Sequence, residues 1–138
     1  PMGEAGVVAI FSNKMLRGEE PTIYGDGNQV RDYVFVGDVA RANLLSLQHL
    51  SKMGFPSSID DHAFNIGTSA GTSVNELYAL LSEIIGFTKM ANRDEPRKGE
   101  LYKIYLDIRK ARENLGFNPS VSLRDGLKAT ISYFTEIR

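Results

Sequence analysis

The stretch from Tyr24 to Leu44, YGDGNQVRDYVFVGDVARANL, limits the possible folds most tightly, because a turn, a strand and the start of a helix follow one another in it. Residues 25–28 have the chemistry of a turn, since glycine adopts positive φ freely and Asp or Asn accepts a hydrogen bond from its own backbone two residues on. The β-branched and aromatic residues 31–36 predict a strand. Asp38 then stands where a carboxylate can cap a helix that runs to about Leu50.

Short strands and amphipathic helices alternate along the rest of the chain, which predicts an α/β fold. Helices are expected at about 6–17, 73–85, 107–115 and 122–134. Short strands are expected at 22–24, 63–66 and 101–106, and exposed loops at 51–62 and 87–99. Ser73 and Glu76 have the spacing of a capping box, and Asp107 is placed to cap the helix after it. The stripe expected to be buried on the helix after Asp38 is Val36, Ala40, Leu44 and Leu47.

Length and composition restrict the class of protein. At 138 residues the chain is expected to form one domain. Its net charge of −1 does not favour nucleic-acid binding, so any anion site must be local. The absence of cysteine excludes disulfides, thiolate catalysis and cysteine-ligated zinc. With no signal peptide and no apolar run long enough for a bilayer, we expect a soluble, cytoplasmic protein without a membrane partner.

Three short patterns look like known sites, but each has a simpler interpretation. G-x-S-x-G at 67–71 matches a nucleophile elbow, yet the only histidines, His49 and His62, precede the serine, against the order that the hydrolases need. G-x-G-x-x-V at 25–30 lacks the third glycine of a dinucleotide loop and leads into a strand. The adjacent residues 60–62, Asp-Asp-His, rarely converge on one metal ion. We interpret the three patterns as two turns and a solvated loop.

Arg31 and Arg97 are the strongest candidates for a binding role. Each lies beside a loop that contains glycine, and a guanidinium binds two phosphate oxygens at once. Ion pairs within the protein are the simpler alternative from spacing alone. The candidate partners are Asp32 or Asp38 for Arg31, and Glu95 or Glu100 for Arg97.

Five segments, taken in order, carry a resemblance to a known family. They are GEAGVVAIF (3–11), IYGDGNQVRDYVFVGDVARAN (23–43), FNIGTSAGTSVNEL (64–77), PRKGEL (96–101) and LDIRKARENLGFNP (106–119). Together they resemble the C-terminal part of extended short-chain dehydrogenase/reductases of the NAD-dependent epimerase/dehydratase family, and most closely UDP-glucose 4-epimerases.

The resemblance implies a fold of two parts, an N-terminal Rossmann domain that binds NAD and a smaller α/β domain that binds the nucleotide sugar. Residues 1–138 resemble only the second part, and the loop-like start at Pro1 indicates a fragment. The family's G-x-x-G-x-x-G loop and Tyr-x-x-x-Lys pair are absent from the chain, so we expect no catalytic, cofactor-binding or metal-binding residue in it and no activity from it by itself. An apolar face that the Rossmann domain normally covers is expected to cause self-association.

The resemblance also implies a binding site for UDP-glucose or UDP-galactose. Arg31 and Arg97 correspond to two arginines that bind the UDP diphosphate, and Glu100 corresponds to an acceptor for the ribose hydroxyls. The residues expected around the nucleoside are Val7 and Val8 near uracil, and Thr22, Ile23 and Tyr24 in a strand beside it, with Tyr24 stacked on or near the base. Another nucleotide-sugar epimerase or dehydratase, or a non-catalytic UDP-sugar-binding module, remains an alternative.

Overall fold

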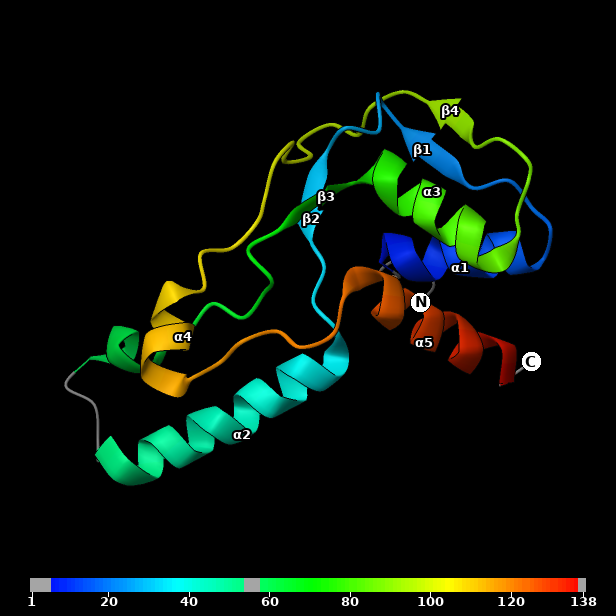
Figure 1. Cartoon of the computed structure of the whole chain (residues 1–138). Helices are drawn as coiled ribbons and strands as arrows, with labels where there is room; N and C mark the ends of the chain where they lie inside the picture. Colours follow the sequence, from blue (N-terminus) through cyan, green and yellow to red (C-terminus); the bar gives the residue numbers. More distant parts are fainter. Residues whose placement is uncertain (1–5, 54–57, 137–138) are drawn as a thin grey trace. The chain divides into compact units, whose positions relative to one another are not determined.

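Short strands and longer helices alternate in the computed structural model, which describes residues 6–53 and 58–136 (Figure 1). The α-helices are α1 (Val7–Leu16), α2 (Val36–Met53), α3 (Val74–Ile85), α4 (Arg109–Leu115) and α5 (Leu123–Glu136). The strands are β1 (Thr22–Tyr24), β2 (Val30–Asp32), β3 (Gly71–Ser73) and β4 (Asn92–Asp94), and a 3₁₀ helix, η1, spans Ile59–His62. The predicted α/β class is confirmed.

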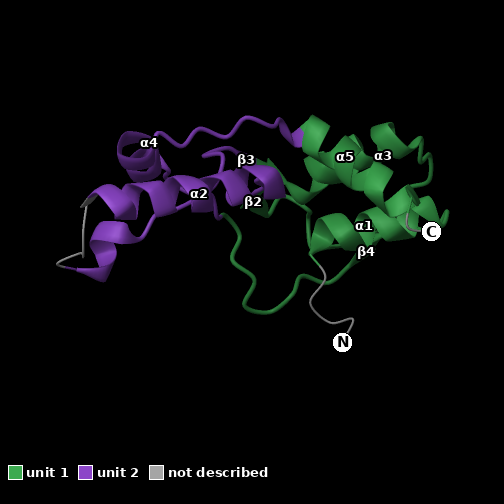
Figure 2. Cartoon of the chain, turned by 90° about the horizontal axis from the view of Figure 1, so that it is seen from below, with its two compact units in different colours: residues 1–31, 72–103, 124–138 green, residues 32–71, 104–123 purple. Residues whose placement is uncertain are grey.

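The chain divides into two compact units, each built from separate segments (Figure 2). Unit 1 consists of residues 1–31, 72–103 and 124–138, and unit 2 of residues 32–71 and 104–123. The assignment of residues 1–138 to one nucleotide-sugar-binding domain stays a prediction.

Unit 1 combines a small parallel sheet with packed helices. β1 and β4 pair in parallel, with Ile23 opposite Arg93, and α1 contacts α3, where the ring of Phe11 meets the ring of Tyr78 edge-on at 6.0 Å between centroids. The buried apolar residues of this unit are Phe11, Met15, Ile23, Val74, Leu77, Leu81, Leu127 and Ile131. Of the apolar stripes expected on the two helices, Leu77, Leu80, Leu81, Ile84 and Ile85 for α3 and Leu123, Leu127, Ile131 and Phe134 for α5, only Leu77 and Leu81 in α3 and Leu127 and Ile131 in α5 are buried, and the others are half-buried.

Unit 2 is organised around the contact between α2 and α4. Its buried cluster consists of Ala42, Ile108, Ala111, Leu115 and Phe117, with Leu45, Phe64, Ile66 and Leu106 packed against it. The small side chain of Ala42 lets α2 approach this cluster closely. This unit therefore has a core of its own, as a separate compact body requires.

Local signals fixed several helix ends where they were predicted. Ser73 and Glu76 form a complete capping box at the start of α3, because the Ser73 side chain accepts from Glu76 N–H and Glu76 accepts from Ser73 N–H. Gly86 and Gly116 follow α3 and α4 with φ values of 75° and 66°, which terminates each helix in the left-handed region. The cap expected from Asp107 does not form as predicted: Ile108 occupies the N-cap position of α4 without a side-chain cap, although Asp107 accepts from Arg109 N–H at 2.9 Å.

The start of α2 was predicted incorrectly. The expected strand over residues 31–36 is confined to β2, and α2 begins already at Val36, so Asp38 lies inside the first turn and does not cap it. The Asp38 carboxylate binds the loop before α5 instead. The predicted buried stripe is largely exposed, with Val36, Leu44 and Leu47 at 73%, 62% and 64% exposure. The apolar pattern was correct, but no described residue covers that face.

Four other local predictions need correction. Residues 63–66 form no strand, and the expected strand 101–106 is reduced to a bridge between Lys103 and Val30. The expected loop 51–62 includes the end of α2 and η1, while residues 54–57 lie outside the described part of the chain. The expected loop 87–99 contains β4. Whether residues 63–66, 101–106 and 92–94 form strands depends on pairing with distant segments. Local residue types do not reveal such pairing.

Candidate functional site

The turn between β1 and β2 forms one wall of the candidate site. Asp26 Oδ1 accepts from Asn28 N–H at 2.8 Å, which closes the turn that the sequence predicted. Gly27 has a φ of 75°, and a Cβ atom on it would lie 2.2 Å from Oδ1 of Asn75, so glycine is required there. Asn75 at the start of α3 and Arg93 in β4 each donate to the carbonyl of Asp26. The turn is therefore held by two neighbouring elements.

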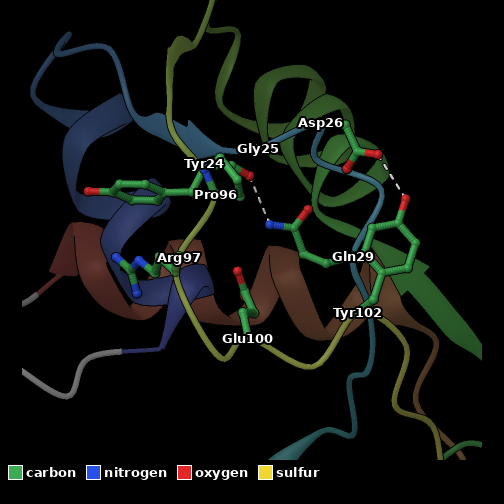
Figure 3. Close-up of a pocket in the computed structure, with 8 residues that line it drawn as sticks. All are labelled: Tyr24, Gly25, Asp26, Gln29, Pro96, Arg97, Glu100 and Tyr102. Atoms are coloured by element: carbon green, nitrogen blue, oxygen red, sulfur yellow. Dashed lines mark hydrogen bonds between the residues drawn. The ribbon is translucent and has the colours of Figure 1, made fainter.

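A pocket of about 280 Å³ lies against this turn (Figure 3). Its lining residues are Tyr24, Gly25, Asp26, Gln29, Pro96, Arg97, Glu100 and Tyr102. Gln29 Nε2 donates to the Tyr24 carbonyl at 3.0 Å, and the Tyr102 hydroxyl donates to Asp26 Oδ2 at 2.8 Å. The first bond joins the end of β1 to the residue just before β2. The second joins the segment after β4 to the turn.

Hydrogen bonds in the site shift the pKa values of Asp26 and Tyr102. Hydrogen bonds from the Asn28 N–H and then from the Tyr102 hydroxyl lower the pKa of Asp26. The hydrogen bond to Asp26 in turn raises the pKa of Tyr102. Near neutral pH the site therefore holds an ionised carboxylate and a protonated phenol at this end.

Arg97 lies over the ring of Tyr24, with its Cζ atom 4.2 Å from the ring centroid. Figure 3 shows the guanidinium and the ring next to each other on one side of the pocket. The ion pairs considered for Arg97, with Glu95 or Glu100, do not occur among the described residues. A guanidinium stacked on an aromatic ring keeps its edge donors available, so Arg97 can bind an anion in the pocket.

Arg31 pairs with Glu100, and with neither of the partners considered from spacing. Its Nη2 atom lies 3.2 Å from Glu100 Oε1, and its Nη1 donates to the Val30 carbonyl at 2.8 Å. Asp32 instead accepts from Thr68 N–H and Ser69 N–H at 2.8 and 3.0 Å. Sequence reasoning named both Arg31 and Glu100 but gave no sign of their contact.

The other predicted site residues do not line the pocket. Ile23 is 1% exposed in β1, so its side chain belongs to the core, and Thr22 is half-buried in the same strand. Val7 and Val8 are half-buried in the first turn of α1. The structure thus brings together Tyr24, Arg31, Arg97 and Glu100, and the roles expected for Val7, Val8, Thr22 and Ile23 stay predictions.

Sequence reasoning missed the contributions of Gln29 and Tyr102 to the pocket. The buried side chain of Gln29 stands just before β2 without any charge or motif to mark it. The hydrogen bond between Tyr102 and Asp26 joins residues that are 76 positions apart in the sequence, so no local sequence pattern predicts it. The only advance signal was the pair of turn residues, Asp26 and Asn28.

The three patterns that were set aside lie in a turn, in bends and in η1 in the described structure. Residues 25–29 connect β1 to β2, so this pattern does not form the strand-to-helix loop that binds a dinucleotide. Ser69 has a φ of 60°, as a nucleophile elbow also would, but no histidine bonds to it among the described residues; the His49 and His62 rings instead lie 5.7 Å apart. No cluster of three metal-ligand side chains occurs within residues 6–53 and 58–136.

Comparison with known proteins identifies relatives of the chain. Residues 1–67 match the model of the NAD dependent epimerase/dehydratase family. The "Putative UDP-glucose 4-epimerase" of Methanocaldococcus jannaschii is 48% identical over 96% of this chain and 40% of its own length. The chain is thus similar to members of this family over nearly its whole length. It spans about 40% of the length of the curated relatives that it matches.

Solved structures of the family have the same fold. The UDP-glucose 4-epimerase of Thermotoga maritima, solved with UDP-glucose, is 52% identical, with a TM-score of 0.87 over 99% of this chain and 41% of its own. The UDP-glucose 4-epimerase of Thermus thermophilus, solved with NAD, is 34% identical, with a TM-score of 0.81 over 98% of this chain and 42% of its own. A protein of Thermodesulfobacterium geofontis named UDP-glucuronate 4-epimerase is 32% identical over 99% of this chain and 40% of its own length. The relatives are therefore named for different UDP-sugars.

Proposed function

We propose that this chain binds the UDP-sugar substrate of an NAD-dependent UDP-glucose 4-epimerase. The observation that carries the proposal is the pocket, where Tyr24, Arg97 and Glu100 converge from β1 and the segment after β4. These are residues to which the family resemblance assigns contacts with the nucleotide. The identity of 48% and 52% to two proteins named as UDP-glucose 4-epimerases supports the same substrate.

The residues of the pocket suit the parts of UDP. Arg97 makes no ion pair within the described chain and offers its guanidinium to the diphosphate, with Arg31 as the second cation behind Glu100. Glu100 offers a carboxylate to the ribose hydroxyls, and the Tyr24 ring offers an apolar surface beside the base. Val7, Val8, Thr22 and Ile23 complete the predicted surroundings of the nucleoside.

Binding through UDP fits the chemistry that the family carries out. A bound NAD would supply the hydride acceptor for C4 of the hexose and the hydride donor for its return to the opposite face. The sugar must turn between these steps, so the affinity has to come from the nucleotide, which does not react. The described residues offer no strand-to-helix glycine loop for NAD, so we assign its binding and the oxidation to a Rossmann domain outside this chain. We expect UDP-galactose to bind at the same site.

Two alternatives concern the sugar and the presence of chemistry. The relative named as a UDP-glucuronate 4-epimerase favours a UDP-uronate as the second candidate, since it matches nearly the whole chain. A carboxylate at C6 of the sugar would then bind in place of a hydroxymethyl group. A UDP-sugar-binding module without catalysis would bind the same ligand. Epimerase activity of a protein that contains both this chain and a Rossmann domain would distinguish an epimerase from such a module. The lack of activity of this chain by itself, and a cytoplasmic location, stay predictions.

Calorimetric titration of the 138-residue chain with UDP-glucose tests the proposal. We expect binding with one site per chain, retained when UDP replaces UDP-glucose because the nucleotide supplies most of the affinity. The Arg97→Leu variant should bind UDP about 10-fold or more weakly, since a charged hydrogen bond contributes about 1.5–3 kcal/mol.

Lys98→Leu is the matched control, because it removes a neighbouring exposed cation that does not line the pocket. It should leave the affinity for UDP within about twofold of the original, as expected for an exposed charge outside the site. Equal losses in Arg97→Leu and Lys98→Leu, or no binding of UDP by the unaltered chain, would contradict the proposal.

A further inference from the structure

Glu100 stands between Arg31 and the pocket. Its carboxylate lines the pocket and lies 3.2 Å from Arg31 Nη2, whereas Arg31 itself is absent from the lining. Figure 3 shows the Glu100 side chain directed toward the middle of the lining residues. An anion that enters from the pocket therefore meets a negative charge before it reaches the second cation.

The ion pair is of a kind that a ligand can displace. It consists of one hydrogen bond and not a bidentate pair, and the two side chains are 29% and 30% exposed. Such exposed pairs contribute little stability, because water and salt screen them. The pair still has a cost for an incoming anion, since the carboxylate must give up its partner and lie beside a second negative charge.

From this arrangement we infer that Glu100 makes the site selective for a nucleoside diphosphate over a bare diphosphate. When both the ribose and the diphosphate enter, the ribose hydroxyls give Glu100 new donors while the phosphate oxygens take Arg31. A bare diphosphate takes Arg31 but has no ribose hydroxyls, so Glu100 loses its cation without gaining the pair of donors that the nucleoside brings. A site discriminates most strongly when the wrong ligand leaves a polar group unpaired. The inference rests on the proposed function.

A simpler role for Glu100 makes a different prediction. If Glu100 only accepts from the ribose, its neutralisation weakens UDP and leaves the affinity for pyrophosphate as it was. If Glu100 also withholds Arg31 from bare anions, neutralisation strengthens pyrophosphate. The sign of the change for pyrophosphate therefore separates selectivity from simple ribose binding.

The test is calorimetric titration of the 138-residue chain and its Glu100→Gln variant with UDP and with inorganic pyrophosphate. Glutamine has the same size and cannot form an ion pair with Arg31. We expect pyrophosphate to bind about fivefold more tightly to Glu100→Gln, as removal of a weak competing pair allows, and the ratio of UDP to pyrophosphate affinity to fall by about 10-fold.

Glu95→Gln is the matched control, because it changes the net charge equally, five residues earlier on the same segment, outside the pocket lining. It should change that ratio by less than about twofold, as a distant exposed charge would. Adding Arg31→Gln to Glu100→Gln should abolish the gain for pyrophosphate, because the cation that was withheld is gone. Circular dichroism spectra confirm that each variant is folded.

The outcomes separate this inference from the proposed function. If the unaltered chain fails to bind UDP, both are overturned. If it binds UDP, but Glu100→Gln leaves pyrophosphate binding unchanged, weaker or undetectable, this inference alone is overturned. The same holds if Glu95→Gln strengthens pyrophosphate as much as Glu100→Gln does, since the effect would then follow from net charge.

Discussion

At the scale of single residues, Asp38 is the carboxylate with the most demanding environment. Its side chain is 2% exposed and accepts from Ser120 N–H and Val121 N–H at 3.0 and 3.1 Å, while Arg41 lies 2.7 Å away. Burial alone would raise the pKa of Asp38, but the bonds from Arg41, Ser120 and Val121 outweigh it and lower the pKa to about 2. Asp38 thus ties the first turn of α2 to the loop before α5 within unit 2.

The low pKa predicts a specific loss of stability in acid. A folded pKa below the usual 3.8 means that the ionised form of Asp38 stabilises the fold above about pH 4, and that this contribution disappears as the pH falls toward 2. A shift of nearly two units corresponds to about 2 kcal/mol. Asp38→Asn should therefore lower the free energy of unfolding by about 2 kcal/mol or more at pH 7, and by much less near pH 2.

Urea unfolding followed by circular dichroism at both pH values measures this difference. Asp60→Asn is the control, because Asp60 is exposed and its side chain makes no hydrogen bond to any other described residue. It should have little effect at either pH. A penalty for Asp38→Asn that is the same at pH 2 and pH 7 would show that shape, and not charge, makes Asp38 important.

At the scale of elements, the sequence revealed what short-range chemistry determines. The capping box of α3 and the glycine after it lie within a few residues of the helix, so both ends were predictable. β4 was not, because its residues are polar and exposed and become a strand only by pairing with β1. The candidate site shows the same division: the family resemblance supplied Arg31 and Glu100, but their contact spans 69 positions and required the structure.

The capping box of α3 allows a test at this scale. Ser73→Ala removes the hydroxyl that accepts from Glu76 N–H at 3.2 Å and should lower stability by about 1 kcal/mol. Bonds from the Ser73 N–H and then from its hydroxyl lower the pKa of Glu76, so the variant should also move that pKa part of the way back up. Thermal unfolding and NMR titration of Glu76 measure the two effects.

Ser132→Ala in the middle of α5 is a suitable control, because among the described residues the Ser132 hydroxyl makes only an exposed bond to Glu136 at 3.3 Å. Alanine favours a helix interior, so this variant should be neutral or slightly stabilising. A loss in Ser132→Ala equal to that in Ser73→Ala would mean that the capping box contributes nothing particular to α3.

At the scale of the whole molecule, the main question is the exposed face of α2. Val36, Leu44 and Leu47 recur at helical spacing and point away from the cluster around Ala42, so the helix is apolar on two sides. No helix of the described residues is long and apolar enough to cross a membrane. Adjacent apolar side chains on a surface favour burial against another protein surface. For the isolated chain, a second copy of the same chain can provide the surface that covers this face of α2.

We therefore predict that the isolated chain self-associates through α2, and that Leu44→Gln with Leu47→Gln shifts it toward the monomer mass of 15.3 kDa. Glutamine keeps a high helix propensity, so the change removes apolar surface without disfavouring α2. Size-exclusion chromatography with light scattering measures the mass over a range of concentrations. The control is Ile59→Gln with Met90→Gln, which removes two apolar side chains outside α2 that are 85% and 86% exposed and should leave the mass unchanged. We expect association because it buries the apolar side chains of α2. A monomer mass for the unaltered chain at every concentration would contradict this role of α2, and so would equal dissociation of both double variants.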